Sequence, residues 1–198
     1  MKTLTLLLAS FVSIALASPA AAPGKAAPAF TLVDAEGKSV SLSDFAGKTV
    51  VLEWINFDCP FVKKHYGSGN MPALQKEALG KEVVWLSIAS SAKGKQGWFE
   101  GDALRQRIAK EKWAGTHYLV DADGKVGKAY GARTTPHMYV VSPDGKVAYA
   151  GAIDDKPSTS PDDIAGSENY VRSALADLGA KKTVEPAATQ PYGCSVKY

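Results

Sequence analysis

The sequence predicts an α/β fold in which a central mixed sheet is flanked by helices and carries a β-hairpin extension at its N-terminal side. Two near-continuous apolar runs, 49–56 and 82–90, have the length and composition of strands covered on both faces. A segment with helical spacing follows each run, which is the pattern of a parallel βαβ unit. Residues 137–154 place two β-rich arms around the turn SPDGK and predict an antiparallel hairpin.

Hydrophobic period and turn residues assign the remaining elements. Alternation around the turn DAEGK predicts the leading hairpin, and apolar residues at helical spacing predict amphipathic helices. In chain order we expect a hairpin at 30–40, a helix from 59 to 79 that GSGNMP interrupts, a helix at 102–113, a short strand with one or two helical turns at 116–132, and a covering helix within 167–182. The tail, TVEPAATQPYGCSVKY, shows no periodicity.

The first residues have the composition of a secretory signal peptide. Lys2 supplies the basic start, Leu4 to Ala17 the apolar stretch, and Ala15-Leu16-Ala17 the cleavage signature. The apolar stretch is shorter than the roughly 20 residues that span a bilayer, although an N-terminal anchor is the alternative. We expect a signal peptide at 1–17 with cleavage between 17 and 28, a leader at 18–28, one domain at 29–181 and a tail at 182–198. The mature protein is then periplasmic or secreted, with no membrane span.

The charge pattern argues against a nucleic-acid partner. The formal net charge is +3, and the basic residues are scattered among acids without a run of five. No cofactor is expected either. The stretch DADGK lacks the further acidic ligands of a calcium loop, and GSGNMP follows a helix and lacks the third glycine of a dinucleotide-binding loop.

The stretch NFDCPFVKKHY predicts a strand that delivers Cys59 to the N-terminus of a helix. Backbone N–H groups and the helix dipole favour an anion there, which lowers the pKa of a thiol below its usual ~8.5. Pro60 suits the first helical turn. Lys63, Lys64 and His65 add positive charge along the same helix. The alternative is that Cys59 is a buried apolar side chain or one half of a static disulfide.

Three stretches together resemble a known family: APAFTLVDAEGKSVSLSDFAGKTVVLEWINFDCPFVKKHY, YGARTTPHMYVVSPDGKVAYAGAIDD and the ending GCSVKY. They are similar to the AhpC/TSA (redoxin) branch of the thioredoxin superfamily, and in particular to its exported peroxiredoxin-like members. The resemblance covers residues 26 to 198. It implies a thioredoxin-like fold, with Cys59 as the nucleophile and Thr135-Pro136 as a cis-proline corner that faces it.

The sequence departs from that family at several positions. A peroxiredoxin carries Pro-x-x-x-Thr-x-x-Cys, but Leu52 and Asn56 stand at the proline and threonine positions. No motif identifies the arginine of a peroxide site; Arg133 is near in sequence and is equally an exposed loop charge. Val62 stands where thioredoxin has its second cysteine.

Cys194 is therefore the candidate resolving cysteine. An exported protein with two cysteines is expected to hold them as one disulfide, Cys59–Cys194. A structural disulfide and a redox-active pair have the same connectivity and differ in how readily the bond is reduced. A soft-metal site at Cys59 and His137, with or without His65, is a weaker alternative, because Lys63 occupies the position of the second cysteine in copper chaperones. We expect no metal.

Three functions fit these residues. The first is an exported thiol–disulfide oxidoreductase in which Cys59 attacks and Cys194 resolves, with protein thiols or disulfides or a periplasmic thiol reductant as partners. The second is a thiol peroxidase acting on peroxides, and the third is a non-catalytic binding module with a structural disulfide. The missing proline and threonine disfavour the second.

Overall fold

The protein is described here by a computed structural model that covers residues 21–198. The predicted signal peptide and the first part of the leader lie outside the described residues. Within 21–198, no helix has the length and apolar character needed to cross a membrane.

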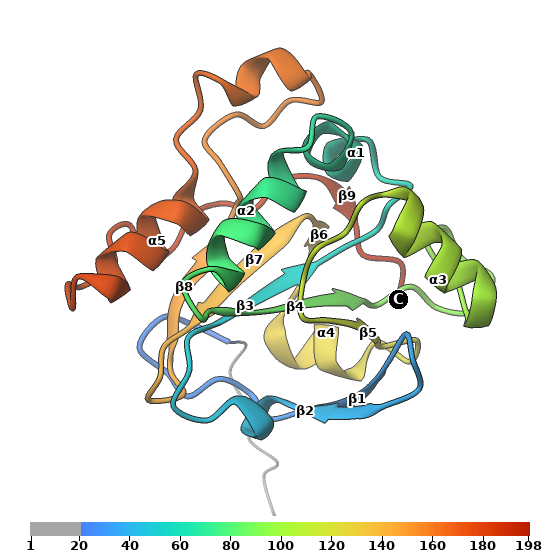
Figure 1. Cartoon of the computed structure of the whole chain (residues 1–198), viewed down its shortest axis with the longest axis horizontal. Helices are drawn as coiled ribbons and strands as arrows, with labels where there is room; N and C mark the ends of the chain where they lie inside the picture. Colours follow the sequence, from blue (N-terminus) through green and yellow to red (C-terminus); the bar gives the residue numbers. More distant parts are fainter. Residues whose placement is uncertain (1–20) are drawn as a thin grey trace, which may run out of the picture.

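A seven-stranded mixed sheet forms the centre of the molecule, as the sequence predicts (Figure 1). Its spatial order is β2-β1-β5-β4-β3-β7-β8. The strands are β1 (Thr31–Asp34), β2 (Ser39–Ser41), β3 (Val50–Trp54), β4 (Val84–Ala89), β5 (His117–Val120), β7 (His137–Val141) and β8 (Val147–Gly151). Strand β4 runs parallel to β3 and to β5, whereas β7 pairs antiparallel with β3 and β1 pairs antiparallel with β5.

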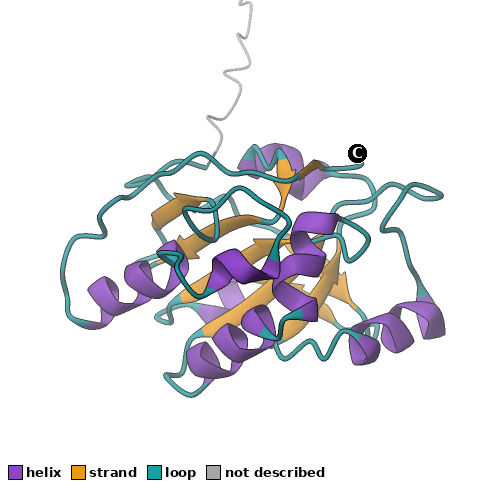
Figure 2. Cartoon of the chain, turned by 90° about the horizontal axis from the view of Figure 1, so that it is seen from above, coloured by secondary structure: helices purple, strands orange, loops and turns teal. Residues whose placement is uncertain are grey.

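Helices cover both faces of the sheet (Figures 1 and 2). They are α1 (Pro60–Gly67), α2 (Asn70–Leu79), α3 (Gly101–Lys110), α4 (Lys125–Tyr130) and α5 (Tyr170–Gly179), with 3-10 turns at Leu42–Phe45 and Pro161–Ile164. Side chains of α1, α2, α3 and α5 pack with Val51 of β3 and with Ile55, which follows this strand, in one core cluster. Alternate residues of β3 point the other way and pack with α4 and the N-terminal hairpin in a second cluster. The apolar runs therefore mark strands buried on both faces, as predicted.

The outer strand β8 is covered by the chain itself. Ala150 accepts a backbone hydrogen bond from Thr189 at 3.2 Å and donates one to Ala187 at 3.0 Å, so the tail lies along this edge. On the leader side, Lys25 accepts a backbone hydrogen bond from Val147 at 2.9 Å. The described part of the leader and the tail therefore both pack against the domain.

The tail contains a strand that the sequence does not reveal. Strand β9 (Cys194–Ser195) pairs antiparallel with β6 (Thr134–Thr135), and Thr135 lies opposite Cys194 in the register. Figure 1 shows the red tail returning across the molecule to bring β9 beside β6. The absence of periodicity in the tail gave no sign of this strand. The reason is that a two-residue strand has no sequence period and forms only through tertiary contact.

Candidate redox site

The site begins where β3 ends and α1 starts. Cys59 is the N-cap residue of α1, with φ −69° and ψ 127°, and Pro60 occupies the first helical turn. The sequence prediction of a cysteine at the mouth of a helix is confirmed. The side chain of Cys59 is fully buried, at 0% exposure.

Two residues whose contacts sequence reasoning did not foresee shape the loop that presents Cys59. The Asn56 side chain accepts a hydrogen bond from the Asp58 backbone at 2.9 Å, and the Asn56 carbonyl accepts one from the Cys59 backbone at 3.0 Å. Arg107 of α3 binds the Asp58 carboxylate and the Phe57 carbonyl, each at 2.8 Å. Asn56 stands where a peroxiredoxin has threonine, and its hydrogen bonds order the loop that presents Cys59.

The Thr135-Pro136 corner faces the thiol. The peptide bond between these two residues is cis, as the resemblance implies. The Cys59 thiol donates a hydrogen bond to the Thr135 carbonyl at 3.0 Å. The Thr135 hydroxyl is buried and has no hydrogen-bond partner among the described residues.

The tail brings the second cysteine to this corner. The backbone pairing of β9 with β6 places Cys194 opposite Thr135, and both cysteines are free thiols in the structure. Gly193 has φ +135°, and a Cβ atom there would lie 2.1 Å from the Thr135 carbonyl oxygen. Only glycine permits so close an approach of the two backbones. Gly193 is therefore a positioning residue for Cys194, and sequence reasoning did not single it out.

Further contacts fasten the tail beyond Cys194. The Val196 backbone donates to the Arg133 carbonyl at 3.1 Å, and the Ala92 backbone donates to the Lys197 carbonyl at 2.8 Å. The Tyr198 hydroxyl donates to the Ala132 carbonyl at 2.7 Å. These contacts hold the tail, and with it Cys194, against the domain.

The two thiols have different acidities. Burial raises the pKa of Cys59, but hydrogen bonds to its sulfur, first from the Cys194 side chain and then from the Cys194 and Val62 backbone N–H groups, outweigh burial, so the pKa is lowered. The Val62 N–H is one of the free donors at the start of α1. Burial, followed by the hydrogen bond and the charge of Cys59, raises the pKa of Cys194 to about 11. Cys59 is therefore the first of the pair to ionise.

Two of the α1 residues predicted to support Cys59, Lys64 and His65, contact Asp154. Lys63 is exposed, and the buried Lys64 ammonium lies 2.9 Å from the Lys156 carbonyl and 3.5 Å from the Asp154 carboxylate. Burial lowers the pKa of His65 to about 4 against the opposing charge of Asp154, so His65 is neutral at pH 7. The largest causes of the lowered pKa of Cys59 are hydrogen bonds and not the charges of these α1 side chains.

The buried cluster of Lys64, His65 and Asp154 anchors the tail. The Tyr192 hydroxyl donates to Asp154, and its oxygen lies 3.4 Å from His65 Nε2. The Tyr192 ring packs edge-on against Phe61 and lies 5.8 Å from the Lys64 ammonium. Tyr192 therefore holds the chain two residues before Cys194.

The histidines of the weaker metal hypothesis are not arranged as ligands. Burial, together with the charge of Arg133, lowers the pKa of His137 to about 3, and His137 Nδ1 accepts the Arg133 backbone N–H at 3.4 Å. Within residues 21–198, no group of three or more His, Cys, Asp or Glu side chains is placed to hold a metal ion.

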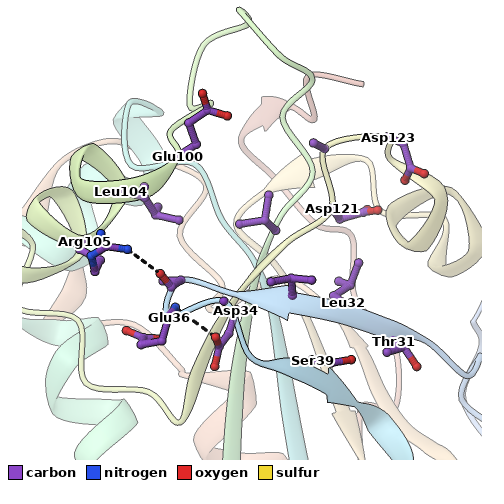
Figure 3. Close-up of a pocket in the computed structure, with 16 residues that line it drawn as sticks. Thr31, Leu32, Asp34, Glu36, Ser39, Glu100, Leu104, Arg105, Asp121 and Asp123 are labelled. Atoms are coloured by element: carbon purple, nitrogen blue, oxygen red, sulfur yellow. Dashed lines mark hydrogen bonds between the residues drawn. The ribbon is translucent and has the colours of Figure 1, made fainter.

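The cysteine pair lies apart from a pocket beside the N-terminal hairpin. A cavity of about 720 Å³ lies between the β1–β2 hairpin, the start of α3 and the loop after β5 (Figure 3). There Arg105 donates to the Ala35 carbonyl at 3.2 Å, and Asp34 accepts the Glu36 backbone N–H at 3.0 Å. Neither cysteine is among its lining residues.

Comparisons with known proteins agree with the fold and with the resemblance. The AhpC/TSA family matches residues 23–150. The thiol-disulfide oxidoreductase ResA of Bacillus thuringiensis subsp. konkukian is 28% identical over 124 residues, which are 63% of this chain and 66% of that protein. The chain thus spans just under two thirds of the length of this curated relative.

Solved structures extend the comparison to most of the chain. An uncharacterised conserved protein from Geobacillus kaustophilus superposes with a TM-score of 0.76 at 28% identity, covering 89% of this chain and 92% of that one. The thioredoxin domain of a thiol-disulfide oxidoreductase from Bacteroides vulgatus gives a TM-score of 0.53 at 24% identity, covering 65% of this chain and 87% of that one. The fold and the cis-proline corner define a protein of the thioredoxin superfamily. Within that superfamily, the chain belongs to the AhpC/TSA family.

The lowered pKa of Cys59 gives a direct prediction. In a Cys194→Ser variant, where a hydroxyl replaces the neighbouring thiol as hydrogen-bond donor, Cys59 is expected to titrate below the ~8.5 of a free cysteine. The rate of alkylation by iodoacetamide against pH measures this. In the matched Cys59→Ser variant, Cys194 should titrate at higher pH, because burial raises its pKa. A Cys59 midpoint at or above the free value would contradict the activation of this thiol.

Proposed function

We propose that this protein is an exported thiol–disulfide oxidoreductase in which Cys59 is the nucleophile and Cys194 the resolving cysteine. The observation that supports this most strongly is the pairing of β9 with β6, because it places Cys194 opposite Thr135, whose carbonyl accepts the Cys59 thiol. Pro60, Thr135 and Pro136 complete the site as supporting residues, and the signal-peptide pattern of residues 1–17 supports export to the periplasm or beyond.

The reaction has two exchange steps. The Cys59 thiolate attacks one sulfur of a partner disulfide, forms a mixed disulfide, and releases the other partner sulfur as a thiolate. Cys194 then loses its proton, attacks the Cys59 sulfur and releases the second partner thiolate. The partner gains two electrons, and the protein is left with a Cys59–Cys194 disulfide.

The acidities of the two thiols favour this order of steps. Cys59 ionises first, whereas Cys194 stays protonated while the anion of Cys59 is beside it. After burial, the hydrogen bond and the charge of Cys59 are the main causes that raise the pKa of Cys194. Both disappear once Cys59 is bound in a mixed disulfide, so the second thiol becomes more acidic at the step that needs it.

Trapping of intermediates tests the assignment. The Cys194→Ser variant should accumulate mixed disulfides through Cys59, because its resolving thiol is missing, and the Cys59→Ser variant should accumulate none. Non-reducing gels of the two variants, recovered from the exported compartment, show the adducts. Adducts that persist in Cys59→Ser would contradict the role of Cys59 as the attacking thiol.

Other results would favour the two remaining functions, a binding module and a thiol peroxidase. Negligible adducts in both variants, with a very negative reduction potential of the disulfide, would support a structural disulfide in a binding module. A fast reaction of the reduced protein with hydrogen peroxide would support a thiol peroxidase, in which Cys59 is oxidised to a sulfenic acid that condenses with Cys194.

A further inference from the structure

A second pocket, the corner pocket, lies beside the Thr135-Pro136 corner, since Arg133 and His137 are among its lining residues. It has a volume of about 580 Å³, within the roughly 300–1,000 Å³ of small-molecule sites. Its walls come from the described start of the leader, from α4 and the loop after it, from strands β7 and β8, and from the tail. Neither cysteine lines it.

The wall of the corner pocket is largely apolar. Tyr130, Tyr139 and Tyr198 line it, and each tyrosine hydroxyl already donates to a backbone carbonyl. In the same order, the acceptors are Pro28 at 2.8 Å, Tyr130 at 2.9 Å and Ala132 at 2.7 Å. The tyrosine rings therefore remain as a surface for the flat apolar body of a ligand.

The charged side chains of the corner pocket are cationic. Lys128 and Arg133 line it, and no Asp or Glu is among the described residues that do. Both residues are exposed, and neither forms an ion pair with a carboxylate of residues 21–198. The Lys128 ammonium lies 5.4 Å from the centre of the Tyr198 ring, at the aromatic wall. A bound anion would supply the counter-charge that these two cations lack.

His137 adds a hydrogen-bond donor to the two cations. It is only 5% exposed, and it is neutral at pH 7 because burial and the charge of Arg133 lower its pKa to about 3. Since Nδ1 accepts the Arg133 backbone N–H, the ring proton is on Nε2. The Nε2 atom is not among the buried side-chain atoms of residues 21–198 that lack a partner, and no group of these residues accepts its proton. It is therefore a donor that faces the pocket His137 lines.

We propose that the corner pocket binds a small organic anion that carries a carboxylate on a flat aromatic body. The planar guanidinium of Arg133 matches the geometry of a carboxylate, and the Lys128 ammonium and the His137 Nε2–H are further donors. The aromatic body packs against the tyrosine rings. This binding does not depend on the proposed function, because neither cysteine takes part in it.

The pocket beside the N-terminal hairpin has the opposite character. Acidic side chains line it, and Figure 3 labels them: Asp34, Glu36, Glu100, Asp121 and Asp123. Its one lining cation, Arg105, is already paired with Asp102 and bonded to the Ala35 carbonyl. That pocket repels a carboxylate, so an anionic ligand distinguishes the two.

A titration with 2-naphthoate tests the proposal, with the backbone amide shifts in NMR spectra of the purified protein as the readout. We expect saturable binding with a dissociation constant of about 1 mM or lower, a modest affinity for a ligand of this size. The uncharged isostere 2-naphthamide should bind about tenfold more weakly, since it lacks the charge that Arg133 and Lys128 bind.

Variants of the exposed cations locate the binding. The double variant Arg133→Gln/Lys128→Gln should weaken 2-naphthoate about tenfold and should no longer prefer it to 2-naphthamide. Lys125→Gln is the matched control, because Lys125 is an exposed lysine of the same helix that pairs with Asp123 and does not line the corner pocket. It should bind 2-naphthoate as the wild type does.

Four results would each overturn the proposal. They are the absence of saturable binding at millimolar concentration, equal affinity of the wild type for the acid and the amide, unchanged binding in the double variant, and an equal loss in Lys125→Gln.

Discussion

Replacing Gly193 by alanine is expected to lift the tail from β6 and to separate the two cysteines. The new Cβ would meet the carbonyl oxygen of Thr135 at 2.1 Å and its carbonyl carbon at 2.8 Å, and neither is a flexible side-chain atom. The backbone of Gly193, with φ +135°, is also unfavourable for alanine. Backbone strain of this kind costs on the order of 1–3 kcal/mol. Since 1.4 kcal/mol is tenfold in an equilibrium constant, the docked tail should become about tenfold less populated or more.

Two rates report the effect. The Cys59–Cys194 disulfide should form about tenfold more slowly in Gly193→Ala under a limiting oxidant, and Cys59 of the reduced protein should react correspondingly faster with iodoacetamide. Gly179→Ala is the matched control, because a Cβ there meets nothing within 4 Å. Wild-type rates in Gly193→Ala would show that the close approach of Gly193 to Thr135 does not position Cys194.

The second large effect is expected at Glu53, in the middle of β3. Its carboxylate is fully buried and accepts four side-chain hydrogen bonds. The donors are Tyr66 at 3.0 Å, Gln75 at 3.2 Å, Trp85 at 2.9 Å and Ser87 at 2.7 Å. Each buried donor that loses its acceptor costs about 1–3 kcal/mol. Glu53→Ala should therefore lower the free energy of unfolding by at least about 3 kcal/mol, and the midpoint of thermal unfolding by roughly 6–12 °C for a chain of this size.

Exposed Glu36 provides the control, and Glu36→Ala should leave the unfolding midpoint nearly unchanged. The pH dependence gives a second readout. Burial raises the pKa of Glu53 above its unfolded value, so its contribution to stability is complete below the unfolded pKa of about 4.3 and is lost as pH rises. The wild type should accordingly gain stability relative to Glu53→Gln as pH is lowered from 7 towards that value. Equal unfolding midpoints for Glu53→Ala and the wild type would contradict the buried network.

Local patterns in the sequence were enough to predict the central sheet and the helix that starts after Cys59. Residues 49–56 and 82–90 are apolar because β3 and β4 are buried on both faces, and that burial leaves a pattern that can be read without a structure. The N-terminal position of Cys59 on α1 follows from the same local signals, a buried strand followed by Cys-Pro and a helical period.

The rest of the site depends on contacts between distant segments. Nothing in the sequence around Lys64 shows that its ammonium forms an ion pair with Asp154, because that pair forms only in the folded core. In the same way, the strand at Cys194 exists only because Gly193 permits a close approach to Thr135. Sequence patterns report the environment of a segment, and they do not report which remote segment provides it.

The course of the tail along β8 has a consequence for how the protein behaves in concentrated solution. Strand β8 is at the end of the sheet, and an uncovered edge strand offers unpaired N–H and C=O groups to other molecules. Residues 187–189 occupy these groups at Ala150. The segment that carries Cys194 therefore also shields the sheet from edge-to-edge association. A change that lifts this segment would therefore uncover the edge of the sheet and raise the risk of aggregation.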